Sequence, residues 1–216
     1  MFGDGRDRLL RPRPVPGAEE ITLLLADDVY AVWREGEPLP YWAFAWPGGQ
    51  AVARWVLDDP DLVRGATVLD LGCASGLVGI AAARAGAARI LCVDVDPRAL
   101  TAAQGNAACN GVEVETVCAD LLAEPGHPLL AGIDLVVAGD LVYVQPLADR
   151  VVAFLRDQAH AGRRAVLADA SRPYAPTSGV RVLAELEVPV DAGLERGPRI
   201  RTQILEVLAD IPTGSD

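Results

Sequence analysis

The stretch Val68-Leu-Asp-Leu-Gly-Cys-Ala-Ser-Gly76 decides the fold expected for this chain. Its first residues belong to a short strand expected over 67–71, and its glycines lead into a helix expected over 77–85. A strand, a glycine turn and a helix N-terminus together form a ligand site at the carboxyl end of a sheet. Glycine suits such a turn because a Cβ atom would keep the backbone away from the ligand.

The alternation of strand and helix continues toward the C-terminus. Near-continuous apolar strands that alternate with helices predict an α/β fold with a doubly wound, mostly parallel sheet. The two last β-rich segments have no helix between them and should pair as a hairpin, which gives an antiparallel C-terminal edge. Strands are expected over 89–93, 112–118, 133–138, 164–167, 184–190 and 200–207, and helices over 97–110, 146–159 and 177–183.

The N-terminal part carries a weaker pattern. Residues 21–35 suggest one or two short strands, and an aromatic-rich loop over 40–49 precedes a helix over 50–58. The first residues are rich in Arg, Pro and Gly without periodicity, which is typical of a loose arm. The expected division is an arm over 1–20 and a single domain over 21–216, in which residues 21–65 cover a core of residues 66–208.

The composition narrows the classes of partner and ligand. The 216 residues carry a formal net charge of −11, which argues against a phosphate-binding surface and therefore against nucleic acid. All 19 basic residues are arginine. We find no apolar run of ~18 residues and no signal-peptide pattern, so a cytoplasmic protein without membrane contact is expected. The four cysteines are interpreted as buried, reduced thiols, and two histidines argue against a metal site.

The residues of the loop distinguish two classes of nucleotide ligand. Dinucleotide sites favour Gly-x-Gly-x-x-Gly, whereas this loop has the spacing Gly72-x-Ala74-x-Gly76. Asp70, two residues before the first glycine, would repel a pyrophosphate but attract the methionyl ammonium of S-adenosylmethionine. The alternative for Asp70 is that it only caps or braces the loop.

Two further carboxylates stand at the ends of the next two strands. Asp94 can accept hydrogen bonds from both ribose hydroxyls of a nucleoside, whereas Asp96 is interpreted as a helix N-cap. Asp120 is placed to accept from the adenine amino group. With Asp70, these side chains predict an S-adenosylmethionine site. Cofactor contacts are also expected from Gly72, Cys73, Ala74, Gly76, Val95 and Leu121.

The fourth strand leads into Gly139-Asp140-Leu-Val-Tyr143. Asp140 lies where a methyl group would be presented, and with Tyr143 it can accept hydrogen bonds from an amine and orient its lone pair. A dry pocket would favour the neutral amine, and a nearby carboxylate would hold the ammonium for binding. The alternative is that Asp140 caps the following helix.

These motifs resemble the seven-strand protein lysine methyltransferases, above all the branch that methylates the β-subunit of electron transfer flavoprotein. The resemblance covers about residues 20–208, and its most specific part is Pro40-Tyr-Trp-Ala-Phe-Ala-Trp-Pro-Gly-Gly-Gln-Ala51. Asp140-x-x-Tyr143 matches the Asp-x-x-Tyr signature of that family, and Asp169-Ala-Ser-Arg172 resembles its Asp-Pro-Gly-Arg segment. The resemblance implies a seven-stranded Rossmann-like sheet, S-adenosyl-L-methionine as methyl donor, S-adenosyl-L-homocysteine as product and a protein lysine as acceptor.

The resemblance also assigns roles to particular residues. It places Trp46, Gly48 and Gly49 around the cofactor, and Asp140 with Tyr143 against the substrate amine. For Trp46 the alternative is ordinary packing at the base of a helix.

The chain departs from the family pattern at three places. Ala74 replaces the second loop glycine, Val144 stands where an acidic residue often follows the signature tyrosine, and Ala170-Ser171 replaces Pro-Gly. The last two departures concern the acceptor more than the cofactor. A small-molecule N- or O-methyltransferase and a non-catalytic cofactor-binding module therefore remain alternatives. The acceptor, the degree of methylation and the oligomeric state are not specified by the sequence.

Overall fold

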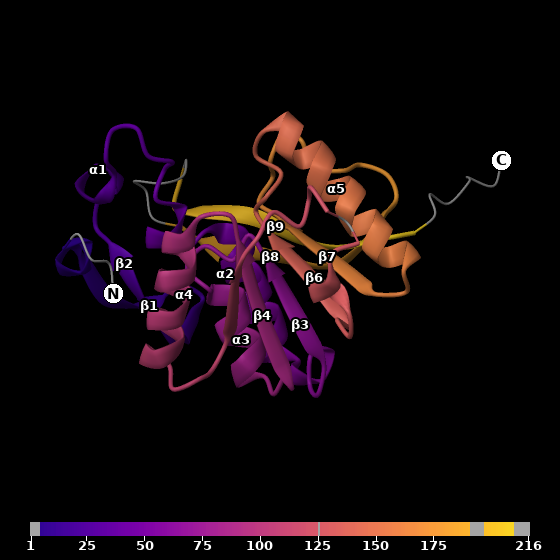
Figure 1. The fold of residues 1–216 in the computed structure, drawn as a ribbon, viewed down its shortest axis with the longest axis horizontal. Coiled ribbons are helices and arrows are strands. Elements are labelled where there is room, and N and C mark those ends of the chain that lie inside the picture. Colours follow the sequence, from indigo (N-terminus) through magenta and orange to yellow (C-terminus); the bar gives the residue numbers. More distant parts are fainter. Residues whose placement is uncertain (1–4, 125, 191–196, 210–216) are drawn as a thin grey trace.

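The computed structural model describes residues 5–124, 126–190 and 197–209, in which a seven-stranded sheet carries helices on both faces (Figure 1). Its strands are β3 (Thr67–Leu71), β4 (Arg89–Asp94), β5 (Glu115–Cys118), β6 (Leu135–Gly139), β7 (Arg164–Asp169), β8 (Val180–Pro189) and β9 (Arg199–Val207). The order across the sheet is β5-β4-β3-β6-β7-β9-β8. Strands β3 to β7 are parallel, and the β8–β9 hairpin joins β7 in antiparallel fashion. The predicted doubly wound sheet is confirmed.

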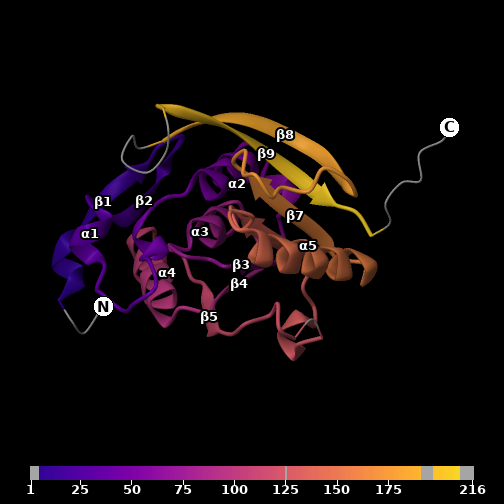
Figure 2. The ribbon, with the colours of Figure 1, turned by 90° about the horizontal axis from the view of Figure 1, so that it is seen from above.

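Helices bury both faces of this sheet. Figure 2 shows α5 (Gln145–His160) on one side and α2 (Pro47–Asp58), α3 (Leu77–Arg84) and α4 (Pro97–Cys109) on the other. Consecutive strand residues point to opposite faces, so Val68 packs with the α2 and α3 cluster while Leu69 packs with the α5 cluster. Burial on both faces is the reason that the strands read as continuous apolar runs.

The N-terminal segment is ordered, and the expectation of a loose arm is wrong for its described part. After η1 (Arg6–Leu9), strands β1 (Leu10–Val15) and β2 (Ala18–Ala26) pair as an antiparallel hairpin beside α4. Asn106 on α4 holds the hairpin, because its Oδ1 accepts the Leu24 N–H at 2.7 Å. The Arg-Pro pairs suit an edge strand, where a missing N–H costs no sheet hydrogen bond. This pairing is long-range, so the local composition does not indicate it.

Other elements differ from expectation mainly near the sheet edges. The helix predicted over 177–183 is wrong, because Val180 begins the edge strand β8, which pairs with β9 along its length. The segment 21–35 holds β2 and the short helix α1 (Val29–Val32). Helix α2 begins at Pro47 rather than Gln50. Short 3-10 helices occupy η2 (Tyr41–Ala43), η3 (Pro60–Leu62) and η4 (Pro128–Leu130).

The cysteines are all free thiols, but only half of them match the buried interpretation. Cys73 and Cys92 are buried. Cys109 and Cys118 are exposed, so the interpretation is wrong for these two. Cys109 ends α4, and Cys118 ends β5 at the edge of the sheet, where a neighbouring strand is present on one side alone.

Candidate functional site

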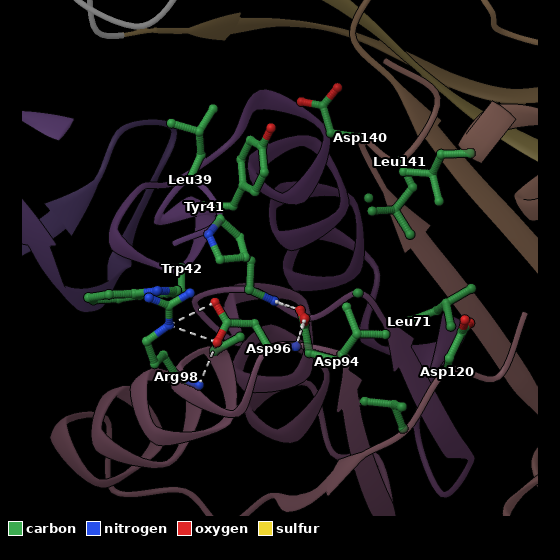
Figure 3. A pocket seen from close by; sticks show the side chains of 18 of the residues that line it. Leu39, Tyr41, Trp42, Leu71, Asp94, Asp96, Arg98, Asp120, Asp140 and Leu141 are labelled. Carbon is green, nitrogen blue, oxygen red and sulfur yellow. Dashed lines mark hydrogen bonds and ion pairs between the residues drawn. The ribbon is translucent and has the colours of Figure 1, made fainter. Parts of the chain in front are cut away.

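A cavity of about 860 Å³ opens at the carboxyl ends of β3, β4, β5 and β6. This is the topological switch point of the sheet: from β3 the chain continues to β4 on one side, and β6 lies on the other side. The volume is that of a small-molecule site, which commonly measures about 300–1,000 Å³. Figure 3 shows the side chains of Asp94, Asp120 and Asp140 around it.

Most of the predicted site residues line this cavity. Other predicted residues lie outside the lining. The sequence interpretation missed a third group, which comes from the N-terminal cover, from two arginines and from the segment after β6. The lining includes Trp46, Gly72, Ala74, Asp94, Val95, Asp120, Leu121, Asp140 and Tyr143. Not among the lining residues are Gly48, Gly49, Asp70, Cys73 and Gly76. The missed lining residues include Glu37, Leu39, Tyr41, Arg98, Leu141 and Arg172.

The loop glycines are required by their neighbours in the protein. Gly72 and Gly76 have positive φ values of 65° and 78°. A Cβ atom would lie 2.9 Å from the Leu141 side chain at Gly72 and 2.7 Å from Ala103 Cβ at Gly76. A larger residue at Gly76 would therefore push α4 away from the loop, whereas at Gly72 it would displace the Leu141 side chain.

Ala74 adopts a conformation that suits glycine better. Its φ is +46°, and its N–H donates to Asp94 Oδ2 at 3.0 Å. Ala74→Gly is expected to raise the free energy of unfolding by about 0.5–1 kcal/mol, because relief of the left-handed strain exceeds the added chain entropy. Denaturant unfolding measures this. The control Ala81→Gly, inside α3, should lower the free energy of unfolding by about 1 kcal/mol. If Ala74→Gly lowered it as well, the backbone of Ala74 would not be strained.

Asp94 is held rigidly at the end of β4. Its two oxygens accept the N–H groups of Ala74 at 3.0 Å and Asp96 at 2.9 Å. Burial raises the pKa of Asp94 above its ordinary value, and these backbone donors oppose that shift. A carboxylate has further lone pairs, so the same oxygens can still accept two hydroxyl donors. The predicted N-cap is confirmed at Asp96, which accepts the Arg98 N–H at 2.9 Å.

Asp70 lies behind the glycine loop. It is buried, and its Oδ2 accepts the Gly79 N–H of α3 at 3.0 Å. Burial raises the pKa of Asp70 to about 7, and the nearby Asp94 carboxylate adds to the rise. This geometry favours the bracing interpretation over contact with a ligand ammonium, because the carboxylate ties the end of β3 to the helix.

The raised pKa of Asp70 gives stability a defined pH dependence. An ordinary aspartate ionises near 3.8 and Asp70 near 7, so between these values the folded state holds a proton that the unfolded chain has lost. Stability from this group is complete below about pH 4 and declines as the pH rises to about 7. The free energy of unfolding should fall between about pH 5 and pH 8, and in Asp70→Asn this fall should be smaller by about 2–3 kcal/mol. Denaturant unfolding at both pH values tests this; a decline unchanged in the variant would contradict it, with Asp61→Asn as the exposed control.

Asp140 joins three elements at the end of the cavity next to β6. Its φ is +61°, and its Oδ1 accepts Arg172 Nε at 2.7 Å. Its Oδ2 accepts Arg172 Nη2 at 3.0 Å and the Gly48 N–H at 3.2 Å. The carboxylate therefore links the ends of β6 and β7 to the first turn of α2. Val144, rather than Asp140, is the N-cap residue of α5.

Aromatic side chains form the wall beside Asp140. The rings of Tyr41 and Tyr143 lie 5.6 Å apart, and Trp46 lies at the same distance from Tyr41. Trp46 Nε1 donates to the Tyr41 carbonyl at 2.8 Å, so the tryptophan faces the cavity in a fixed orientation. Burial, followed by the Tyr41 hydroxyl, raises the pKa of Tyr143 to about 12. Tyr143 therefore stays a neutral phenol that can donate and accept hydrogen bonds.

A salt-bridge chain fastens the N-terminal cover over the cavity. Glu37 accepts Arg6 Nη2 at 2.8 Å and Arg98 Nη1 at 2.6 Å. Arg98 also binds Asp96 through Nε at 2.9 Å. The loop that contributes Leu39 is thereby tied to the start of α4. The sequence signal for these contacts is weak, because 61 residues separate Glu37 from Arg98.

Among the described residues, no group of three or more His, Cys, Asp or Glu side chains could hold a metal ion. The same part of the chain contains no helix that is long and apolar enough to cross a membrane.

Comparisons with curated proteins give consistent relatives. The chain is 39% identical over 160 residues to the electron transfer flavoprotein beta subunit lysine methyltransferase of Rattus norvegicus, which covers 71% of this chain and 62% of that protein. The Homo sapiens protein of the same name is 39% identical over 168 residues, 71% of this chain and 60% of that protein. The chain thus matches less than two thirds of the length of these relatives. They confirm the resemblance that the motifs carry.

Solved structures share the fold. The ribosomal protein L11 methylase from Lactobacillus delbrueckii subsp. bulgaricus has a TM-score of 0.51 at 20% identity, over 76% of this chain and 81% of that one. An RNA methyltransferase from Salinibacter ruber in complex with S-adenosyl-L-homocysteine has a TM-score of 0.51 at 18% identity, over 77% and 96%.

A family model covers the part of the chain that holds the loop and the four strand ends. The model described as ribosomal protein L11 methyltransferase (PrmA) matches residues 56–172, which is more than half of the 216 residues. The chain therefore belongs to the ribosomal protein L11 methyltransferase (PrmA) family.

Proposed function

We propose that this protein transfers methyl groups from S-adenosyl-L-methionine to a lysine side chain of a protein. One observation carries the proposal: a single cavity places the rigid Asp94 carboxylate at one strand end and the Asp140–Tyr143 pair at another. The first suits a nucleoside ribose and the second suits an amine. The names of the curated relatives support the lysine acceptor.

The residues of the cavity fit the cofactor. Asp94 would accept the ribose hydroxyls, and the loop from Gly72 to Ala74 would approach the methionyl part closely. Asp120 follows β5, and its carboxylate accepts Arg150 Nη2 at 2.9 Å and the Leu122 N–H at 3.1 Å. The same carboxylate would accept a hydrogen bond from the adenine amino group. Val95 is exposed within the lining, so a flat adenine ring would cover an apolar side chain. When bound, the cofactor supplies an electrophilic methyl group.

The residues at the acceptor end prepare the amine. A lysine ammonium with an ordinary pKa of about 10.4 must lose its proton before its nitrogen can attack. A lysine seated against the aromatic wall of Tyr41, Trp46 and Tyr143 would lose part of its water shell, which favours the neutral form. The Tyr143 hydroxyl remains protonated and can hydrogen-bond the amine. Acceleration then comes from orientation and removal of water.

Other parts of the proposal concern the partner and the location. The net charge of −11 supports a protein segment with basic residues as the acceptor and opposes nucleic acid. Four free thiols support a reducing compartment, the cytoplasm.

The test is methyl incorporation from labelled cofactor. The protein is incubated with the β-subunit of an electron transfer flavoprotein, and labelled lysines are located by mass spectrometry. We expect label on lysine in the β-subunit and a large loss of label with Tyr143→Phe, which removes the hydroxyl alone. Label on a small metabolite, with none on protein, would overturn the lysine acceptor and favour the small-molecule alternative.

A further inference from the structure

Arg172 forms an ion pair with Asp140, the carboxylate that would bind the acceptor amine in the proposed function. It lines the cavity, and two of its nitrogens bind the two Asp140 oxygens at 2.7 and 3.0 Å. The exposed fractions of the two side chains are 18% for Arg172 and 5% for Asp140. The Arg172 N–H also donates to Asp169 Oδ1 at 2.9 Å, which fixes the backbone of the segment after β7.

A buried carboxylate such as Asp140 is strongly stabilised by a cation beside it. Removing one partner of a buried ion pair leaves an uncompensated charge, which is far more costly than exchanging one cation for another. A lysine ammonium that enters the cavity is such a cation. Both it and the Arg172 guanidinium seek the same two oxygens.

An arginine at position 172 can pair with Asp140 without becoming a methyl acceptor itself. A guanidinium stays protonated at any working pH and its nitrogen lone pairs are delocalised over the planar group, so it is a far weaker methyl acceptor than a neutral amine. A lysine at the same place could lose its proton and become an acceptor. The chain contains 19 basic residues and every one is arginine, so no side-chain amine of its own competes for methylation.

We propose that Arg172 occupies the acceptor's cation subsite on Asp140 until the acceptor lysine enters, and that the guanidinium and the ammonium exchange there. This inference rests on the proposed function for the identity of the acceptor. The subsite itself rests on the geometry of Asp140 and Arg172.

The first test places a lysine in the subsite. Arg172→Lys introduces the only lysine of the chain, and the protein is incubated with S-adenosyl-L-methionine alone. The introduced amine, after losing a proton to solvent, forms an N–C bond to the methyl carbon while the C–S bond breaks and its electron pair stays on sulfur. Mass spectrometry should find methyl-lysine at position 172, formed at least about 10-fold faster than at position 181 of the control Arg181→Lys. Arg181 is 65% exposed on β8, outside the cavity lining.

The second test needs no cofactor and no transfer. Arg172→Ala should lower the melting temperature by about 6–15 °C, because Asp140 loses its countercharge. n-Butylammonium chloride at about ten times its dissociation constant for the variant should then restore about 3–6 °C, and it should stabilise wild-type protein less, because Arg172 competes for the same oxygens. The control Arg150→Ala removes a cation from the exposed carboxylate of Asp120, so butylammonium should not stabilise it.

The outcomes separate this inference from the proposed function. Methylation at position 172 of Arg172→Lys, together with rescue of Arg172→Ala, supports the subsite. An unmodified lysine in an Arg172→Lys protein that still binds S-adenosyl-L-homocysteine, or no rescue by butylammonium, overturns it. Rescue and methylation at position 172 combined with no transfer to any protein would keep the subsite and overturn the protein acceptor.

Discussion

Asp140→Asn is expected to lower kcat/KM for methyl transfer about 100- to 1,000-fold, the size of effect seen when one preorganised polar group at a reacting centre is removed. The asparagine oxygen can still accept the Gly48 N–H. Its amide would no longer provide a negative charge, so neither Arg172 nor an incoming ammonium would find its partner. Stability should fall as well, by about 3 kcal/mol, because the Arg172 guanidinium is left without its buried countercharge.

Steady-state kinetics with labelled cofactor and the flavoprotein β-subunit measure this loss. The affinity for S-adenosyl-L-homocysteine should stay within about threefold of wild type, because the ribose carboxylate lies on another strand. Asp134→Asn is a matched control: Asp134 Oδ2 accepts the Thr67 N–H at 2.8 Å at the opposite end of β3. Transfer by Asp140→Asn within about fivefold of the control would mean that Asp140 does not serve the acceptor.

Gly48→Ala should destabilise the fold by about 3 kcal/mol or more, because the added atom meets backbone on two sides. Its Cβ would lie 2.6 Å from Asp140 N and 3.1 Å from the Ala168 carbonyl oxygen. Those two atoms already form a hydrogen bond of 2.9 Å, so neither can withdraw without breaking the junction of β6 and β7. The displaced Asp140 would also lose its place in the cavity.

The adjacent glycine gives a matched control. At Gly49 a Cβ would make only ordinary contacts, 3.6 Å to Leu77 and 3.9 Å to Val78. Since both glycines are in the first turn of α2, Gly49→Ala should be neutral or stabilising by up to about 1 kcal/mol. Denaturant unfolding of the two variants measures the contrast. Equal stability would contradict the close approach of α2 to the strand ends.

The sequence predicts which residues meet at the ends of β3, β4 and β5, because each part is local. The glycine loop, Asp94 and Asp120 each follow a buried strand within a few residues, and parallel strands bring such ends together. The N-cap role of Asp96 is confirmed for the same reason. Asp70 also lies near the end of a buried strand, but the orientation of its side chain is set by the hydrogen bond from Gly79 N–H in the following helix.

The arrangement around Asp140, the proposed acceptor site, depends on contacts between distant residues. Arg172 and Asp140 are 32 positions apart, and the Gly48–Asp140 contact spans 92. The motif around Arg172 is present in the sequence, but its pairing with Asp140 depends on the register of β6 and β7, which sets their carboxyl ends side by side. Strand β1 and the first residues of β8 escaped prediction similarly, since their partners are the distant β2 residues and the end of β9.

Calorimetric titration with S-adenosyl-L-homocysteine tests most directly whether this cavity is a cofactor site built around Asp94. We expect one site per chain in the wild-type protein. Asp94→Ala should weaken binding at least about 10-fold, because two hydroxyl donors lose a charged acceptor. Binding that is equally tight in the variant, or no binding by the wild-type protein, would contradict the assignment of this cavity.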